Sequence, residues 1–332
     1  MSSVKKFAHV NAKAKGMYHK CLTYDDYLDL VKQGNLEGVF VRLKENFETL
    51  QDTSDVKPTR EMMEKFLREN LMEDVNKLAR LLDQHSIQIL KQYMEKYKIE
   101  YMKDKYMSFM MGKKQGINQI KNLKELYQEI NELDSCKNLQ EFFDFIRDTK
   151  YEPIFEKHNS DYFEPETKSL FDLENELEKM YYVNLYKYLK KEREDAVLHL
   201  VSKQIDLSNV LWIYRGQTYY HFSSEMRDHM IPVSIGLTEE AIEKLLSGQS
   251  YEDVLQHSMY QNVLQEEGDL EEKIKRYLYA LYRREFKTDV FSMLMVITYV
   301  ELKEQQIKNI INIVEGIRYD RNRQEILRKV IV

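Results

Sequence analysis

The sequence predicts an all-α protein, and three observations support this prediction. Glycine and proline are scarce, at 10 and 4 of 332 residues, whereas leucine, lysine, glutamate and methionine, which favour helices, are abundant. Apolar residues recur three or four positions apart along most of the chain, as they do on one face of a helix. A short motif also recurs at a period of about a hundred residues, which is typical of duplicated helical subdomains.

The repeated motif places an asparagine, a glycine and a tyrosine at the same offsets. Its two full copies are Asn209–Tyr219 and Asn309–Tyr319, and a weaker copy occupies Lys105–Gly112. Apolar residues fill the matching positions between the asparagine and the glycine. The residue before the glycine differs between the copies and is Met111, Arg215 or Glu315. We expect Gly316 to permit close packing or a helix end.

A pair of short helices is expected near the N-terminus, at about 22–47. Thr23 is a good N-cap, and Asp25 and Asp26 follow it in the first turn, where the helix dipole favours anions. Gly34 is a C-cap signal for the first helix of this pair. The second helix shows one apolar face at helical spacing.

Similar short pairs are expected twice more along the chain. One begins at Asn122, which has Glu125 at the spacing of a capping box. The other begins near Leu237 and turns at Gly248. Longer helices with apolar stripes precede these pairs, at about 59–112 and from Pro165 to the Asn209 motif. A third long set runs from Gly268 to the Asn309 motif.

This order of elements predicts three similar helical subdomains. The first covers 59–158 and the second covers 159–265. The third combines 266–332 with 1–58, because its missing short pair is supplied by the N-terminal residues. We therefore expect the N-terminal pair to pack against the C-terminal long helices, since a single helix pair of this size is marginal alone.

Composition excludes several classes of function. The net charge of −6 and the lack of a basic block argue against a nucleic-acid partner. The most apolar run, 290–300, is shorter than the ~20 residues of a membrane span and predicts a buried helix. Cys21 and Cys136 are expected to be free thiols.

No enzyme signature is present, so no catalytic residue, cofactor or metal ligand is assigned. Gly112 lies beside lysines, but the spacing of a phosphate-binding loop is absent and a helix C-cap is the better interpretation. His19 and Cys21 have no second pair at ligand spacing, which argues against zinc. His221, His229 and His257 are expected to cap helices or face solvent; an all-helical enzyme that uses His221 and His229 is the remaining alternative.

Arg215 and Glu315 occupy equivalent positions with opposite charge. Two interpretations stay open: they pair with each other, or each is an exposed residue of a last helical turn, where ion pairs contribute little. The candidates for packing or for a partner interface are Met111, Arg215, Tyr219, Glu315, Arg318 and Tyr319.

Several segments, taken in order, resemble the C/d subunit family of V/A-type rotary ATPases. They are 11–15, 22–30, 149–151, 207–216 and 307–316, and the resemblance covers essentially the whole chain. Arginine precedes the glycine at Gly216 as in the family, whereas Glu315 and Met111 depart from that pattern.

The resemblance implies a non-catalytic rotor subunit without cofactors. It implies three bundles in a pseudo-threefold, funnel-shaped body that seats the foot of the central shaft, subunits D and F. The narrow side would rest on the membrane rotor ring, at the cytoplasmic face of a bacterial or archaeal plasma membrane, and so link ATP hydrolysis or synthesis to proton or sodium transport. A cytosolic helical-repeat scaffold that binds a protein partner is the alternative.

Overall fold

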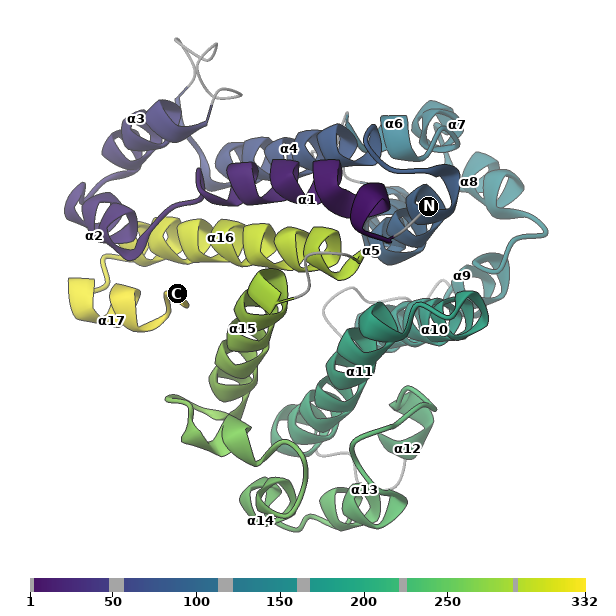
Figure 1. Ribbon diagram of the computed structural model, residues 1–332. Coiled ribbons are helices and arrows are strands. Elements are labelled where there is room, and N and C mark those ends of the chain that lie inside the picture. The colour runs from purple at the N-terminus through teal and green to yellow at the C-terminus, as the bar shows by residue number, and fades with distance from the viewer. Residues whose placement is uncertain (1–2, 48–56, 113–121, 160–167, 221–225, 289–291) are drawn as a thin grey trace. The chain divides into compact units, whose positions relative to one another are not determined.

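The computed structural model describes residues 3–47, 57–112, 122–159, 168–220, 226–288 and 292–332. Within these ranges every regular element is a helix, so the all-α prediction is confirmed (Figure 1). In this part of the chain no helix is both long and apolar enough to cross a bilayer. The helices group into two compact units, each described below by itself.

Unit 1 comprises Met1–Leu90, Gln119–Leu126 and Lys275–Val332. Its elements are α1 (Ser3–Tyr18), α2 (Tyr24–Lys32), α3 (Leu36–Asn46), α4 (Arg60–Ala79), the start of α5 (Gln84–Met110), α6 (Leu123–Leu126), most of α15 (Leu270–Thr288), α16 (Leu294–Arg318) and α17 (Arg323–Arg328). Helix α16 is its centre and packs against α4 and α1, as Figure 1 shows. Helix α2 packs against α16 and α17, so segments from both ends of the chain share one core.

The burial of α16 explains why it is the centre of unit 1. Residues 293–300, within the most apolar run of the sequence, are at most 4% exposed. The prediction of a buried helix there is confirmed for its described part. Such a helix is stable only when other helices cover it on all sides, because burial of its apolar surface provides most of its stability.

Unit 2 comprises Lys91–Asn118 and Tyr127–Ile274. Its elements are the rest of α5, α7 (Ile130–Ser135), α8 (Leu139–Ile146), α9 (Glu152–Lys157), α10 (Lys168–Glu192), α11 (Asp195–Arg215), the π-helix η2 (Gly216–Tyr220), α12 (Met226–His229), α13 (Glu239–Leu246), α14 (Tyr251–Gln256), the 3₁₀ helix η3 (Gln261–Gln265) and the start of α15. Helices α10 and α11 pack on each other as a hairpin, and α12 and α13 lie against α11 (Figure 1). The three subdomains 59–158, 159–265 and 266–332 plus 1–58 stay a prediction.

Capping residues set several of the helix starts. Thr23 accepts the N–H of Asp26, whose carboxylate in turn accepts the N–H of Thr23 at 2.8 Å. This reciprocal pair confirms the predicted cap, and Gly34, with φ 70°, ends the helix as expected.

The helix expected to begin at Asn122 starts directly after this residue, and its capping box stays a prediction. The Asn122 side-chain amide donates to the Glu69 carbonyl at 3.2 Å, and Glu125 pairs with Arg80 at 3.2 Å. The helix that follows, α6, is only one turn long. Contacts with α4 and its end therefore also hold this segment, and local sequence signals do not reveal them.

Candidate partner-binding site

The repeated asparagine holds a downstream segment against its helix by the same pair of hydrogen bonds in each unit. In unit 1 the Asn309 Nδ2 donates to the Ile331 carbonyl at 2.7 Å, and its Oδ1 accepts the Ile331 N–H at 3.1 Å. In unit 2 the same two bonds join Asn209 to Ile231 at 3.0 and 2.8 Å. Both partners lie 22 residues downstream, and both asparagines are 1% exposed. We call this arrangement the asparagine clasp; it is a structural device that satisfies two buried backbone groups at once.

The glycine of each full motif is required by close packing. A Cβ added at Gly316 would lie 2.6 Å from Cγ1 of Ile326, and one at Gly216 would lie 2.2 Å from Sδ of Met226. Neither glycine has a positive φ, so of the two expected roles for Gly316, close packing is the correct one.

The weaker copy of the motif works differently. Gly112 has φ 58°, and no atom of the described residues lies within 4 Å of its added Cβ, so it ends α5 as a left-handed C-cap. Lys105 stands in place of the asparagine and donates to the Asp134 carbonyl at 3.2 Å. The two lysines after Gly112 lie outside the described residues.

Arg215 and Glu315 are each paired within their own unit. Arg215 meets both carboxylate oxygens of Glu271, with Nη2 at 2.8 Å and Nε at 3.2 Å. Glu315 accepts a hydrogen bond from the Arg60 Nε at 3.0 Å. The two equivalent positions thus each form an ion pair, with the arginine on the motif in one unit and the glutamate on the motif in the other. Arg215 and Glu315 therefore pair with Glu271 and Arg60 and not with each other. Both pairs are partly exposed and contribute little to stability.

The tyrosine that closes each full motif is exposed. Tyr219 lies in η2 and is 65% exposed, and Tyr319 follows α16 and is 66% exposed. Arg318 is also exposed, with its guanidinium 5.7 Å from the ring centre of Tyr319. Tyrosine and arginine are over-represented among the residues that dominate binding at protein interfaces. Met111, at the end of α5, is half-buried.

Buried carboxylates that accept tyrosine hydroxyls are structural features of the core that sequence reasoning missed. Asp206 in α11 is fully buried and accepts the Tyr260 hydroxyl at 2.6 Å. In unit 1, Asp74 accepts the Tyr299 hydroxyl at 2.6 Å, and burial together with the Asp74 charge raises the pKa of Tyr299. The hydroxyl therefore stays protonated and donates. An acidic residue inside an apolar helical stripe is the signal that could have found Asp206.

The described histidines and cysteines do not come together in a recognisable catalytic or metal-binding site. His229 contacts Asn175, with 3.2 Å between Nδ1 and Oδ1, and His257 is the C-cap residue of α14. His221 lies outside the described residues. Cys21 and Cys136 are free thiols as expected, and burial raises the pKa of both, which lowers their reactivity. Among the described residues no three histidine, cysteine, aspartate or glutamate side chains are placed to hold a metal ion.

These features are structural clasps, paired charges and exposed aromatic residues, and their chemistry is that of packing and surface contact. Comparison with known sequences identifies the family: the profile of the ATP synthase (C/AC39) subunit family matches residues 10–329, and the chain belongs to this family. Its members are non-catalytic subunits of rotary ATPases.

Two curated relatives are both named as the C subunit of an A-type ATP synthase. The protein of Methanococcoides burtonii is 24% identical over 257 residues, which cover 74% of this chain and 68% of the relative. The protein of Methanosarcina mazei is 24% identical over 269 residues, which cover 76% and 71%.

Proposed function

We propose that this protein is a central-stalk subunit of a V/A-type rotary ATPase and acts as a socket between the D–F shaft and the membrane rotor ring. The observation that carries this proposal is the family match over residues 10–329. The relatives in Methanococcoides burtonii and Methanosarcina mazei are named as subunits of an A-type ATP synthase, which supports placement in the same kind of complex. In this role the protein sits at the cytoplasmic face of the membrane, held by the rotor ring, and is part of the coupling between ATP turnover and ion transport.

A torque-transmitting part needs internal stiffness, and the two units contain devices that supply it. Asn209 and Asn309 tie a following segment to a long helix in each unit. Gly216 and Gly316 bring the next segment into direct contact with the same helices. Each clasp resists sliding of its segment, because any shift would leave two buried backbone groups without partners.

We propose that Tyr219, Tyr319 and Arg318 contact the shaft or the ring. We also propose that the residue before each motif glycine differs (Met111, Arg215 or Glu315) because the three copies meet different surfaces of a shaft that lacks threefold symmetry. The tyrosines are large, exposed and equivalently placed in the two motifs. A shaft or ring contact that transmits torque should bury at least the ~1,600 Å² of an ordinary stable interface. Exposed aromatic residues are the natural anchors of such a contact.

The test is association of the purified full chain with a D–F complex and, separately, with the detergent-solubilised rotor ring. We expect binding to both and no binding of ATP. Tyr219→Ala and Tyr319→Ala should each weaken one of these contacts by about 1–2 kcal/mol, which is roughly 5- to 30-fold in Kd. Tyr24→Ala is the matched control, because Tyr24 is a 47% exposed tyrosine outside the motif. Failure to associate with either partner would overturn the proposal.

Cell fractionation separates this proposal from the alternative of a free scaffold. A rotor subunit travels with the membrane-bound ATPase, and dissociates with the shaft subunits when the complex is stripped. A scaffold remains in the supernatant whether or not the ATPase is present.

A further inference from the structure

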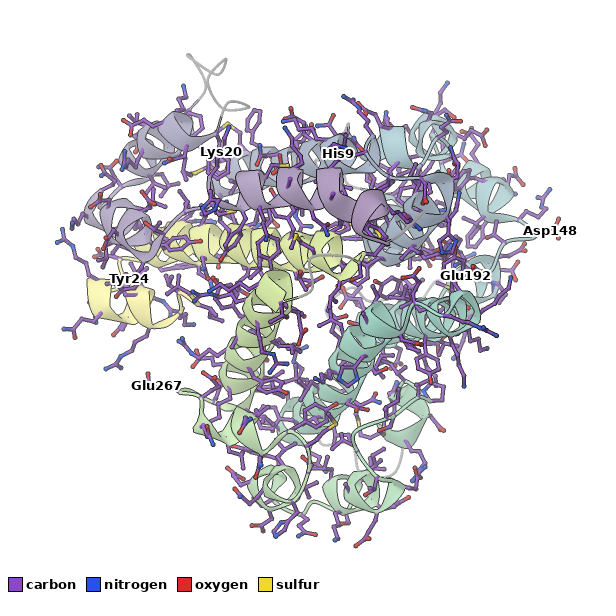
Figure 2. All side chains as sticks on the ribbon, viewed as in Figure 1. His9, Lys20, Tyr24, Asp148, Glu192 and Glu267 are labelled. Atoms are coloured by element: carbon purple, nitrogen blue, oxygen red, sulfur yellow. The ribbon has the colours of Figure 1, made fainter. Side chains whose placement is uncertain are left out.

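Unit 1 contains a pocket that the clasps and the exposed tyrosines do not explain. It has a volume of about 440 Å³ and lies between the α1–α2 connection, α15 and α16. Tyr18, Tyr27 and Tyr279 are among its walls, together with Cys21, Arg283 and Gln306. Tyr24, labelled in Figure 2, also lines it and is half exposed. We call this the tyrosine pocket; its volume falls in the range of small-molecule sites.

Gln306 brings a buried donor to the pocket. The side chain is 4% exposed, and its Oε1 accepts the Leu22 N–H at 2.7 Å. This bond fixes the amide so that Nε2 is the other end, and Nε2 has no hydrogen-bond partner among the described residues. Buried amide groups are normally hydrogen-bonded, so an unpaired one at a pocket wall indicates an acceptor on a ligand.

Arg283 brings a second donor and a positive charge. Its buried Nε has no hydrogen-bond partner in the described part of the chain. Its guanidinium lies 5.7 Å from the ring centre of Tyr279 and hydrogen-bonds to Tyr18. Among the described residues that line the pocket, none is an aspartate or a glutamate. A guanidinium whose Nε–H is unpaired among the described residues, in a pocket whose described lining holds no carboxylate, favours an anionic group, to which arginine donates strong hydrogen bonds.

The remaining walls define the rest of the ligand. Tyrosine side chains and Leu302 contribute apolar atoms to the lining, against which an aromatic body can pack. Burial raises the pKa of Tyr279 to about 12, so its hydroxyl is protonated and is a further donor at neutral pH.

We propose that the tyrosine pocket binds a small organic anion, with its carboxylate or phosphate on Gln306 Nε2 and Arg283 and its apolar body against the tyrosine rings. Such a ligand joins the α1–α2 connection to α15 and α16 and stabilises unit 1 by mass action. This site does not depend on the rotor function proposed above.

The test is calorimetric titration of the full chain with phenyl phosphate, benzoate, inorganic phosphate and the neutral benzyl alcohol. We expect at least one of the two aromatic anions to bind about tenfold or more tightly than benzyl alcohol. The preference between phenyl phosphate and benzoate identifies the head group, and competition by inorganic phosphate shows whether the head group binds by itself.

Three variants locate the site. Gln306→Glu keeps an acceptor for the Leu22 N–H but replaces the free donor by an oxygen, and Arg283→Met removes the guanidinium while retaining the stem. Both should weaken the aromatic anion about tenfold or more. Arg284→Met is the matched control, because Arg284 is exposed and paired with Glu285 at 2.7 Å; it should leave binding unchanged.

A labelling experiment keeps the proposal testable if a variant does not fold. Cys21 lines the pocket, so in the Cys136→Ser background the aromatic anion should slow its alkylation at pH 8.5. The proposal is overturned if no aromatic anion binds by ~10 mM, if benzyl alcohol binds equally well, if Arg284→Met weakens binding as much as Arg283→Met, or if bound anion leaves the alkylation of Cys21 unchanged.

Discussion

Replacing Asp206 by asparagine should destabilise unit 2 through a clash of hydrogen-bond donors. Each oxygen of the carboxylate accepts one backbone N–H: Oδ1 accepts from Ile235 at 3.2 Å and Oδ2 from Gly236 at 2.6 Å. A backbone N–H cannot become an acceptor. In either orientation of the new amide, its NH₂ group therefore faces one of these two donors and leaves it unpaired.

The size of the effect follows from the four hydrogen bonds that Asp206 accepts from described residues. The hydroxyls of Ser234 and Tyr260, at 2.8 and 2.6 Å, can rotate and adapt to an amide. The stranded backbone N–H costs about 1–3 kcal/mol, and loss of charge from the remaining bonds adds about 1 kcal/mol or more. We expect Asp206→Asn to lower the free energy of unfolding of unit 2 by about 3 kcal/mol, a large part of the 5–15 kcal/mol of a typical domain.

Urea denaturation at pH 7 measures this loss, and Glu95→Gln is the matched control in the same unit. Among the described residues, the donors to the Glu95 Oε1 are both side chains, the Tyr151 hydroxyl and Lys150 at 2.7 Å. A glutamine carbonyl can still accept both, so this variant should lose less than about 1.5 kcal/mol. Amide exchange at 235 and 236 should accelerate in Asp206→Asn alone. Equal losses in the two variants would refute the role given to the backbone donors.

Three further predictions concern the glycines, a buried acid and a strained turn. Gly316→Ala should lower the free energy of unfolding by about 1–2 kcal/mol, because the neighbour of Gly316 is a branched isoleucine side chain. Gly216→Ala should lower it less, because the neighbouring methionine is flexible and can move, and Gly16→Ala at an exposed site should raise it by about 0.5–1 kcal/mol. An equal loss of stability at all three glycines would contradict the packing argument. Burial raises the pKa of Glu178 from 4.5 to about 7, so the stability it contributes is complete below pH 4.5 and lost as the pH rises to about 7. Urea denaturation at pH 5 and pH 8 should show this loss in the wild type and a smaller one in Glu178→Gln; identical pH profiles would refute it. Arg193, with φ 58° between α10 and α11, should tolerate Arg193→Gly without loss of thermal stability, since glycine relieves the strain.

Local signals in the sequence were enough to predict the helices and some of their ends. Thr23 caps the start of α2 and Gly34 follows its end, as expected, because a cap depends on residues only a few positions apart. The contacts of Asn122 could not be predicted, for the opposite reason. Its side chain bonds to α4, far away in sequence, and no local pattern carries that information.

In the candidate site, too, local properties could be predicted from the sequence and contacts between distant segments could not. Tyr219 and Tyr319 are exposed, because each lies beyond the last apolar turn of its helix. Their role in a partner interface stays a prediction. The partners of Arg215 and Glu315 could not be read from the motif, since Glu271 lies 56 residues and Arg60 lies 255 residues away in sequence. Asp206 was overlooked because its four partners lie in distant turns that only the folded chain brings together.

The sequence by itself determined that the chain is helical, which runs are buried and which motif recurs, because helical period and capping are local properties of the chain. Only the tertiary structure decided what the recurring motif does. Asn209 and Asn309 form the same clasp, and their glycines permit the same close contact, whereas Gly112 only ends a helix. These roles depend on which distant segment returns to each glycine, and that is fixed by the packing of the whole unit.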